Sequence, residues 1–155
     1  MNAIIAALDL QEKTEVVLNK AAEMARKLNA ELHLVHVIPP VGTYTGINVM
    51  DPLGALEPAI LPNEIELINA HKKAAEEELS KLVESLQVKP VAVNILLGSV
   101  EDEVVNYAQE AGAEMIVVGT HQRSGLSRLL SGETSVRILH EAQIPILVVP
   151  TVENN

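Results

Sequence analysis

The chain has no cysteine, and its 155 residues include only two aromatic side chains, Tyr44 and Tyr107. The absence of cysteine excludes disulfide bonds, thiol catalysis and zinc or iron–sulfur sites with cysteine ligands. Because phenylalanine and tryptophan are also absent, the core must be built from Val, Ile, Leu, Ala and Met. Such residues suit strands that helices bury on both faces, as in parallel α/β sheets.

Basic residues are scarce, with 11 Lys and Arg against 21 Asp and Glu, so the net charge is −10. An acidic surface repels phosphate backbones and anionic lipids, and we therefore expect no nucleic-acid binding. No apolar stretch approaches the roughly 20 residues that span a bilayer. No basic segment precedes the first apolar run, which argues against a signal peptide. We expect a cytoplasmic location and no membrane insertion.

Hydrophobic periodicity and turn residues predict alternating strands and helices. The expected strands are Ala3–Leu8, Glu31–Ile38, Val91–Leu97, Met115–Val118 and Ile144–Val149. The expected helices are Thr14–Leu28 with Val17, Ala21, Met24 and Leu28 on its buried face, Asn63–Leu86, a third capped by Ser99 and ending at Gly112, and a last one near Leu129–Glu141. Residues 39 to 62 form a long connection, of a length that is usually functional or mobile.

This alternation predicts a Rossmann-like α/β fold, a single five-stranded parallel sheet with helices on both faces and strand order 3-2-1-4-5. We expect one domain over residues 1–150 and a frayed tail over residues 151–155. Pro145 cannot donate to a sheet ladder, so the last strand is expected either at an edge of the sheet or paired with a less regular segment.

In open sheets of this kind, ligands bind beyond the carboxyl ends of the strands, where the strand order reverses. That place lies between the first and fourth strands and predicts a site formed by Asp9, the segment Val37–Pro40 and the loop from Gly119 onward. Glycines allow backbone N–H groups to approach phosphate, and a helix beginning near Gly132 adds a positive dipole. Glycines also serve plain turns, and that alternative stays open.

Several polar residues have a structural and a functional interpretation. Asp9 either accepts hydrogen bonds from a ligand or caps the first helix, and His121 either contacts a ligand or packs in its loop. His36 is expected to be a hydrogen-bonded core histidine, and His33 to share its face without an acidic partner. The sequence shows neither a Ser–His–acid arrangement, nor paired carboxylates, nor a Walker loop, so we expect no enzymatic activity and no metal site.

Four segments together resemble the universal stress protein family over roughly residues 2 to 150. They are Ile4–Asp9, Leu34–Val37, Ile116–His121 and Ile144–Pro150. The resemblance implies an adenine nucleotide alpha hydrolase-like fold and a homodimer that pairs through the edge strand Ile144–Pro150. It also implies that Asp9 lies near ribose and adenine and that Val37 packs on adenine.

Nucleotide-binding members of that family resemble Gly-x2-Gly-x9-Gly-[Ser/Thr]. In this chain Gly119 and Gly132 keep that spacing, but Gln122 replaces the middle glycine. Glu133 occupies the Ser/Thr position, and Thr134 follows one residue late. A carboxylate about 4 Å from a phosphate charge costs roughly 4 kcal/mol at an effective dielectric constant near 20. The candidate nucleotide crevice comprises Asp9, Val37, Val118, Gly119, His121, Gln122, Arg123, Gly132, Glu133 and Thr134.

The pattern of Gly119, His121 and Gln122 is similar to the branch of the family that does not bind ATP. The expected function is therefore that of a non-enzymatic stress-response regulator, a homodimer that acts on an unknown protein partner without a cofactor. The alternative is a sensor that binds ATP or AMP with Mg²⁺.

Overall fold

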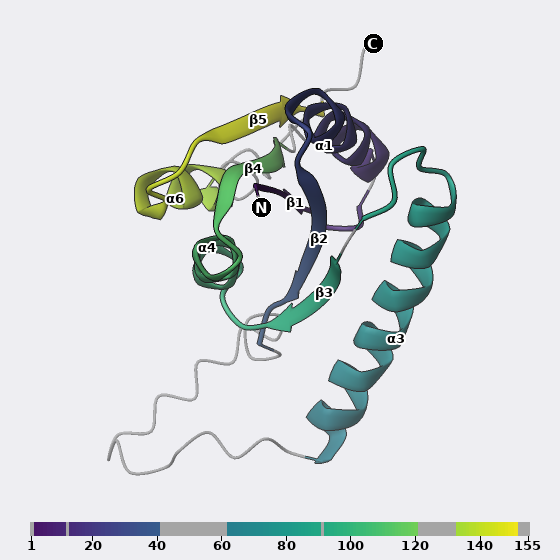
Figure 1. Cartoon of the computed structure of the whole chain (residues 1–155). Helices are drawn as coiled ribbons and strands as arrows, with labels where there is room; N and C mark the ends of the chain where they lie inside the picture. Colours follow the sequence, from purple (N-terminus) through teal and green to yellow (C-terminus); the bar gives the residue numbers. More distant parts are fainter. Residues whose placement is uncertain (1, 12, 41–61, 91, 121–132, 152–155) are drawn as a thin grey trace.

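The computed structural model describes residues 2–11, 13–40, 62–90, 92–120 and 133–151. Its centre is a five-stranded parallel sheet with the order β3-β2-β1-β4-β5 (Figure 1). The strands are β1 (Ala3–Ala7), β2 (Glu31–Ile38), β3 (Ala92–Leu97), β4 (Ala113–Thr120) and β5 (Ile146–Pro150). The predicted fold class and strand order are confirmed.

Four described helices cover the two faces of the sheet (Figure 1). They are α1 (Thr14–Leu28), α3 (Pro62–Glu84), α4 (Val100–Glu110) and α6 (Glu133–Glu141). Alternate strand residues point to opposite faces, so two clusters of buried residues form. Ile4, Leu34 and Val117 pack with α1 and α3 on one face. Ile5 and Ile116 pack with α4 and α6 on the other.

Helix α1 has the predicted bounds, but its buried face is rotated from the one expected. Val17 and Ala21 are buried as expected, whereas Leu28 is 45% exposed. The buried set is Thr14, Val17, Leu18, Ala21, Ala22 and Ala25. The prediction followed the +4, +3 and +4 spacing of the expected residues, whereas the observed face is centred on Leu18, Ala21 and Ala25. Its small alanines allow the helix to lie close to the sheet. Asn29 ends the helix with φ 51°, the left-handed conformation predicted for it.

Other element boundaries differ from the predictions by a few residues. Strand β4 is longer at both ends than Met115–Val118, and β5 begins two residues after Ile144. Helix α3 begins one residue before its predicted cap, Asn63, and ends at Glu84. Ser99 occupies the N-cap position of α4, but its hydroxyl donates to Glu101 Oε2 (2.9 Å) and accepts no capping hydrogen bond from a backbone N–H of the helix.

Strand β5 lies at an edge of the sheet, as Pro145 predicted. The Pro145 carbonyl accepts a hydrogen bond from Ile116 N–H (3.0 Å). Thr151, expected to begin a frayed tail, is 7% exposed, and both its N–H and its hydroxyl donate to the Thr120 carbonyl. Thr151 therefore holds the end of β5 against β4, and the rest of the predicted tail, residues 152–155, lies outside the described residues.

Candidate functional site

The strand order reverses between β1 and β4, so their carboxyl ends meet in the position predicted for a ligand. Ala7 pairs with Val118 on one side and with Val35 on the other. Asp9 follows two residues after Ala7, and Gly119 follows directly after Val118. The fold thus brings Asp9, Val37 and Gly119 to one edge of the molecule from three distant parts of the chain.

Asp9 is held at the start of the turn between β1 and α1. Its Oδ1 accepts hydrogen bonds from the Thr14 hydroxyl and from Gln11 N–H, both at 3.1 Å. The N-cap position of α1 belongs to Lys13, so the expectation that Asp9 caps the helix directly is wrong. Asp9 instead braces the first turn through Thr14, a partner that the sequence spacing did not suggest.

The backbone of this turn is unusual for residues with side chains. Leu10 has φ 58° and Lys13 has φ 67°, both in the left-handed region. Left-handed non-glycine residues cost on the order of 1 kcal/mol or more, and they cluster at ligand sites and tight turns. The hydrogen bonds from Gln11 and Thr14 to Asp9 offset part of that cost.

Gly119 lies close to two side chains from other parts of the fold. A Cβ atom built at this position would lie 2.7 Å from Val17 Cγ2 and 3.3 Å from Thr151 Cγ2. The first distance is shorter than any ordinary carbon–carbon contact. Gly119 is therefore required by the packing of α1 and β5 against β4, whatever further part it plays toward a ligand. Sequence reasoning missed Val17 and Thr151 because both contacts are tertiary.

The two valines of the candidate crevice belong to the core. Val37 is 6% exposed and Val118 is 4% exposed, and both lie in the cluster on the α4 and α6 side of the sheet. Neither presents a bare apolar surface at the strand ends. An adenine ring that packed on Val37, as the family resemblance implies, would have to displace or flank its present neighbours.

The remaining predicted crevice residues are not described at the level of side chains. His121, Gln122, Arg123 and Gly132 lie outside the described residues. Glu133 and Thr134 form the first two residues of α6, and only their helical backbone is described. The helix that was predicted to begin near Gly132 is thus present from Glu133 onward.

A second polar cluster lies near the opposite end of the strands, against α4. The Tyr107 hydroxyl contacts His33 Nδ1 (2.9 Å) and accepts a hydrogen bond from Asn94 Nδ2 (2.7 Å). Burial raises the pKa of Tyr107, and the Asn94 hydrogen bond acts in the opposite direction. Glu31 Oε2 lies 3.6 Å from His33 Nε2, so the expectation of no acidic neighbour was wrong.

The two strand histidines lie on opposite faces of the sheet. They are three positions apart, and the side-chain period of a strand is two, so the expected shared face was an error. His33 contacts Tyr107 of α4, whereas His36 Nδ1 contacts the Leu8 carbonyl at 2.7 Å. His36 is hydrogen-bonded and partly buried, in line with its structural interpretation.

An ion pair joins the two helices on this face. Arg137 of α6 lies 3.0 Å from Glu101 Oε1 of α4, and Glu101 is 9% exposed. Arg137 is one of the few arginines in the second half of the chain. Its contact with Glu101 directs it toward α4, so it is part of the helix interface.

Within the described ranges, no group of three or more His, Asp or Glu residues is arranged to hold a metal ion. Among the helices described, none has the length and apolar character required to cross a membrane.

The parallel sheet with order β3-β2-β1-β4-β5 and helices on both faces defines a doubly wound, Rossmann-like α/β fold. The model of the universal stress protein family matches residues 1–150. The chain belongs to the universal stress protein family.

Relatives and solved structures agree with this assignment. Universal stress protein A homolog 1 of Coxiella burnetii is 32% identical over 146 residues, covering 94% of each chain. Universal stress protein YxiE of Bacillus subtilis is 28% identical and covers 96% of this chain and 98% of its own. The universal stress protein UspA from Lactobacillus plantarum has the same fold, with a TM-score of 0.71 at 19% identity over 96% of this chain and 97% of that one.

Two further structures of this fold hold nucleotides. A universal stress protein in complex with cAMP has a TM-score of 0.60 at 16% identity and covers 96% of this chain and 95% of that one. The universal stress protein from Archaeoglobus fulgidus in complex with dAMP has a TM-score of 0.59 at 22% identity, covering 96% of both chains.

Proposed function

We propose that this protein is a cytoplasmic, non-enzymatic stress-response regulator that acts as a homodimer on a protein partner and binds nucleotide weakly or not at all. The absence of a nucleophile–base arrangement in the sequence supports the non-enzymatic part. The family membership supports the role in stress responses. The contacts within the candidate crevice support weak or absent nucleotide binding.

The observation that carries the proposal is that the described crevice residues serve the fold. Asp9 Oδ1 accepts from Thr14 and Gln11, and Gly119 gives Val17 the room that it needs. A ligand would have to compete with these contacts. Glu133 adds a carboxylate at the beginning of α6, and a repulsion of roughly 4 kcal/mol corresponds to about a thousandfold loss of affinity.

The homodimer is argued from the β5 edge. Val136 and Leu139 of α6 are 51% and 55% exposed, although both are apolar. Thr151 N–H donates to Thr120, so by strand alternation Ile146 and Val148 turn their backbone groups away from β4. A second copy that paired along β5 would cover both the strand edge and apolar helix surface. Sedimentation of a Val148→Pro variant, which lacks an outward donor, should show a smaller species than the parent protein.

The test of nucleotide binding uses the protein as purified. After heat denaturation, we expect no absorbance at 260 nm in the supernatant, and ATP with Mg²⁺ should leave the melting temperature unchanged. A ligand at 100 times its dissociation constant stabilises a protein by about 2.7 kcal/mol, which such a measurement detects. Released nucleotide, or a clear rise in melting temperature, would contradict the proposal.

A matched pair of variants assigns the loss of binding to its cause. Gln122→Gly combined with Glu133→Ser restores the family pattern, and we expect this double variant to gain ATP-dependent stabilisation. Gln122→Gly alone keeps the carboxylate and should gain less. If neither variant responds to ATP, the loss lies in the described part of the crevice, around Asp9 and Val37.

An adenine-nucleotide sensor is the second candidate, and one observation favours it. Leu10 and Lys13 hold the left-handed backbone beside Asp9, at the place where ligands bind in this fold. The solved relatives with cAMP and dAMP show that the fold accommodates nucleotides. In that case the bound nucleotide would alter the choice of partner, and the protein would carry adenine nucleotide after purification.

A further inference from the structure

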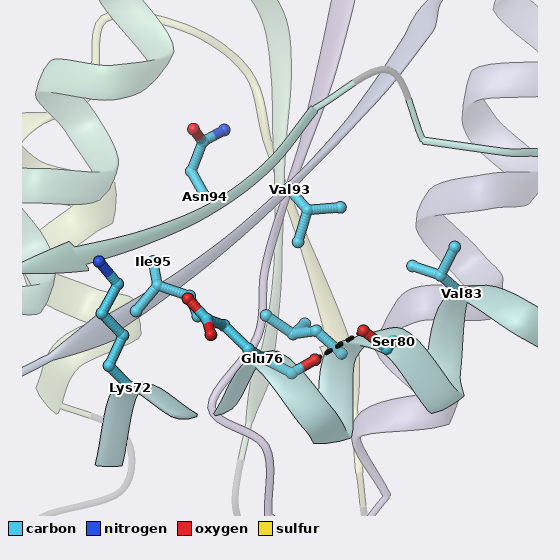
Figure 2. A pocket seen from close by; sticks show the side chains of 8 residues that line it. Lys72, Glu76, Ser80, Val83, Val93, Asn94 and Ile95 are labelled. Atoms are coloured by element: carbon cyan, nitrogen blue, oxygen red, sulfur yellow. Dashed lines mark hydrogen bonds between the residues drawn. The ribbon is translucent and has the colours of Figure 1, made fainter. Parts of the chain in front are cut away.

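A groove of about 430 Å³ separates α3 from β3, away from the crevice described above (Figure 2). Apolar side chains line it from both elements, Leu79 and Val83 on the helix and Val93 and Ile95 on the strand, and the polar residues Ser80 and Asn94 complete the lining. Lys72 and Glu76 of α3 stand at its rim. The groove carries one charge of each sign, so it does not share the strongly negative balance of the whole chain. Its volume is within the range of sites that bind ligands.

The strand that lines the groove is the last one on its side of the sheet. Strand β3 pairs with β2 from His33↔Ala92 to Ile38↔Leu97, and the described residues form no strand beyond it. In a parallel ladder both backbone groups of a residue point to the same neighbour, and successive residues alternate. Gly98 N–H donates to the Ile38 carbonyl (3.1 Å), so Asn94 and Leu96 turn their backbone groups toward β2.

By the same alternation, Val93, Ile95 and Leu97 direct their N–H and C=O groups away from β2. Their side chains lie on the α3 face of the sheet, because Asn94 contacts Tyr107 on the α4 face. Val93 is 46% exposed and Leu97 is 53% exposed. The same three residues therefore offer an unused backbone edge and apolar side chains beside a groove.

We propose that this face binds an extended peptide, which adds to the sheet as a strand beside β3 and places aliphatic side chains in the α3–β3 groove. Only an extended chain satisfies both features together, because its hydrogen-bonding groups and its side chains alternate with the same period of two. Val93 to Leu97 spans roughly 13 Å of strand, enough for a five-residue segment. Alternate Val, Ile or Leu residues in the peptide would cover Val93 and Leu97.

The backbone alternation can be checked before any peptide is used. Hydrogen exchange followed by NMR should find the Val93, Ile95 and Leu97 amides fast, and the Asn94, Leu96 and Gly98 amides slow. A peptide that adds to this edge must slow the first set. Protection of all six amides in the free protein at low concentration would show that the edge is already covered, and would overturn the proposal.

The probe is a library of random twelve-residue peptides displayed on phage, selected on the immobilised full-length protein. The best peptide is then synthesised with a fluorescent label. Val93→Pro removes one outward donor while the ladder to β2 remains, since proline is tolerated where the N–H faces away from the sheet. We expect this variant to weaken binding roughly tenfold, as for the loss of one buried hydrogen bond.

Val93→Thr is the matched control, because it keeps the N–H and the branched side chain, and its affinity should stay close to that of the parent protein. Leu97→Lys tests the groove independently if Val93→Pro does not fold. A selection that yields no binding peptide overturns the proposal. So do peptides that bind the parent protein, Val93→Pro and Leu97→Lys with equal affinity. So does a Val93→Pro variant that dissociates a dimer without weakening the peptide, because the edge then belongs to a second copy.

Discussion

The two faces of the sheet are covered by helices in different ways. On the α1 and α3 side, close approach of backbone and side chain decides the fit, as at Gly119 beside Val17. On the α4 and α6 side, an apolar cluster of similar character is supplemented by directed polar contacts, Tyr107 with His33 and Arg137 with Glu101. Shape fixes how near a helix can lie, whereas hydrogen bonds fix where along the sheet it sits.

The largest effect is expected on the first face, from Gly119→Ala. Its added methyl group would lie 2.7 Å from Val17 Cγ2, so α1 or β4 must shift. Overpacking of this kind costs about 1 to 3 kcal/mol of unfolding free energy. Urea denaturation of the variant measures that loss directly.

A second substitution distinguishes steric conflict from other causes. Val17→Ala removes the opposing methyl groups, and we expect the double variant to be more stable than the sum of the two single changes predicts. Additive losses in the double-mutant cycle would show that Val17 is not the residue that excludes a side chain at Gly119.

On the other face, Tyr107→Phe should cost about 1 to 2 kcal/mol. The variant keeps the ring but leaves His33 Nδ1 and Asn94 Nδ2 without the hydroxyl that they now contact. Partly buried groups that lose a partner cost more than the net value of one hydrogen bond. Thermal and urea unfolding at neutral pH measure this cost, and a loss below 0.5 kcal/mol, roughly the low end of one hydrogen bond, would speak against a directing role.

The raised pKa of Tyr107 also predicts that the stability of the protein depends on pH in the alkaline range. Its pKa is raised in the folded protein, so folding favours the neutral phenol. Tyr107 makes its full contribution to the free energy of unfolding below the unfolded-state pKa of about 10. That contribution is lost as pH rises through the higher folded-state pKa. Stability of the parent should therefore fall at alkaline pH, and Tyr107→Phe should flatten that fall. Tyr44→Phe is the control, since it removes the other tyrosine and should leave the fall in place.

The smallest effect is expected at the exposed surface of α1. Glu23 lies between Lys20 (2.6 Å) and Lys27 (2.5 Å), and their hydrogen bonds and charges lower its pKa from 4.5 to about 2. A depressed carboxyl pKa gives stability that is present above pH 4.5 and is lost as pH falls toward 2. Glu23→Gln should weaken this acid dependence slightly.

Salt distinguishes this charge cluster from the ion pair on the other face. The Glu23 contacts lie on the solvent-facing side of one helix, and salt should screen them strongly. Glu101 is largely buried against Arg137, so the pair between α4 and α6 should be less sensitive. Equal salt sensitivity of Glu23→Gln and Glu101→Gln would remove this difference between the faces.

Much of the sheet could be predicted from sequence because its strands are short apolar runs separated by turn residues. Strand β2 and helix α1 have the predicted bounds, and Pro145 indicated that β5 lies at an edge. Boundaries that depend on partners were less accurate. Strand β4 extends to Thr120 because Thr151 binds its carbonyl, and neither residue carries a sequence signal for that contact.

The candidate site divides in the same way. The convergence of Asp9, Val37 and Gly119 followed from the order of strands, because parallel strands end at the same edge of a sheet. The hydrogen-bond and packing partners of these residues could not be predicted from the order of strands. Thr14 on Asp9 and Val17 beside Gly119 are set by how α1 docks. The neighbour of His33 could have been predicted, because Glu31 lies two residues earlier on the same strand and therefore shares its face.

The amino-acid sequence by itself determined the class of fold, the family and the edge of the sheet to which Asp9, Val37 and Gly119 converge, since these depend on periodicity, spacing and motif. The tertiary structure alone decided that Gly119 is needed for helix packing, that Asp9 braces α1, and that β3 is the outermost strand on its side among the described residues and lies beside a groove. The physical reason is that contacts between distant segments depend on how closely and at what angle helices meet the sheet, which local sequence patterns do not specify.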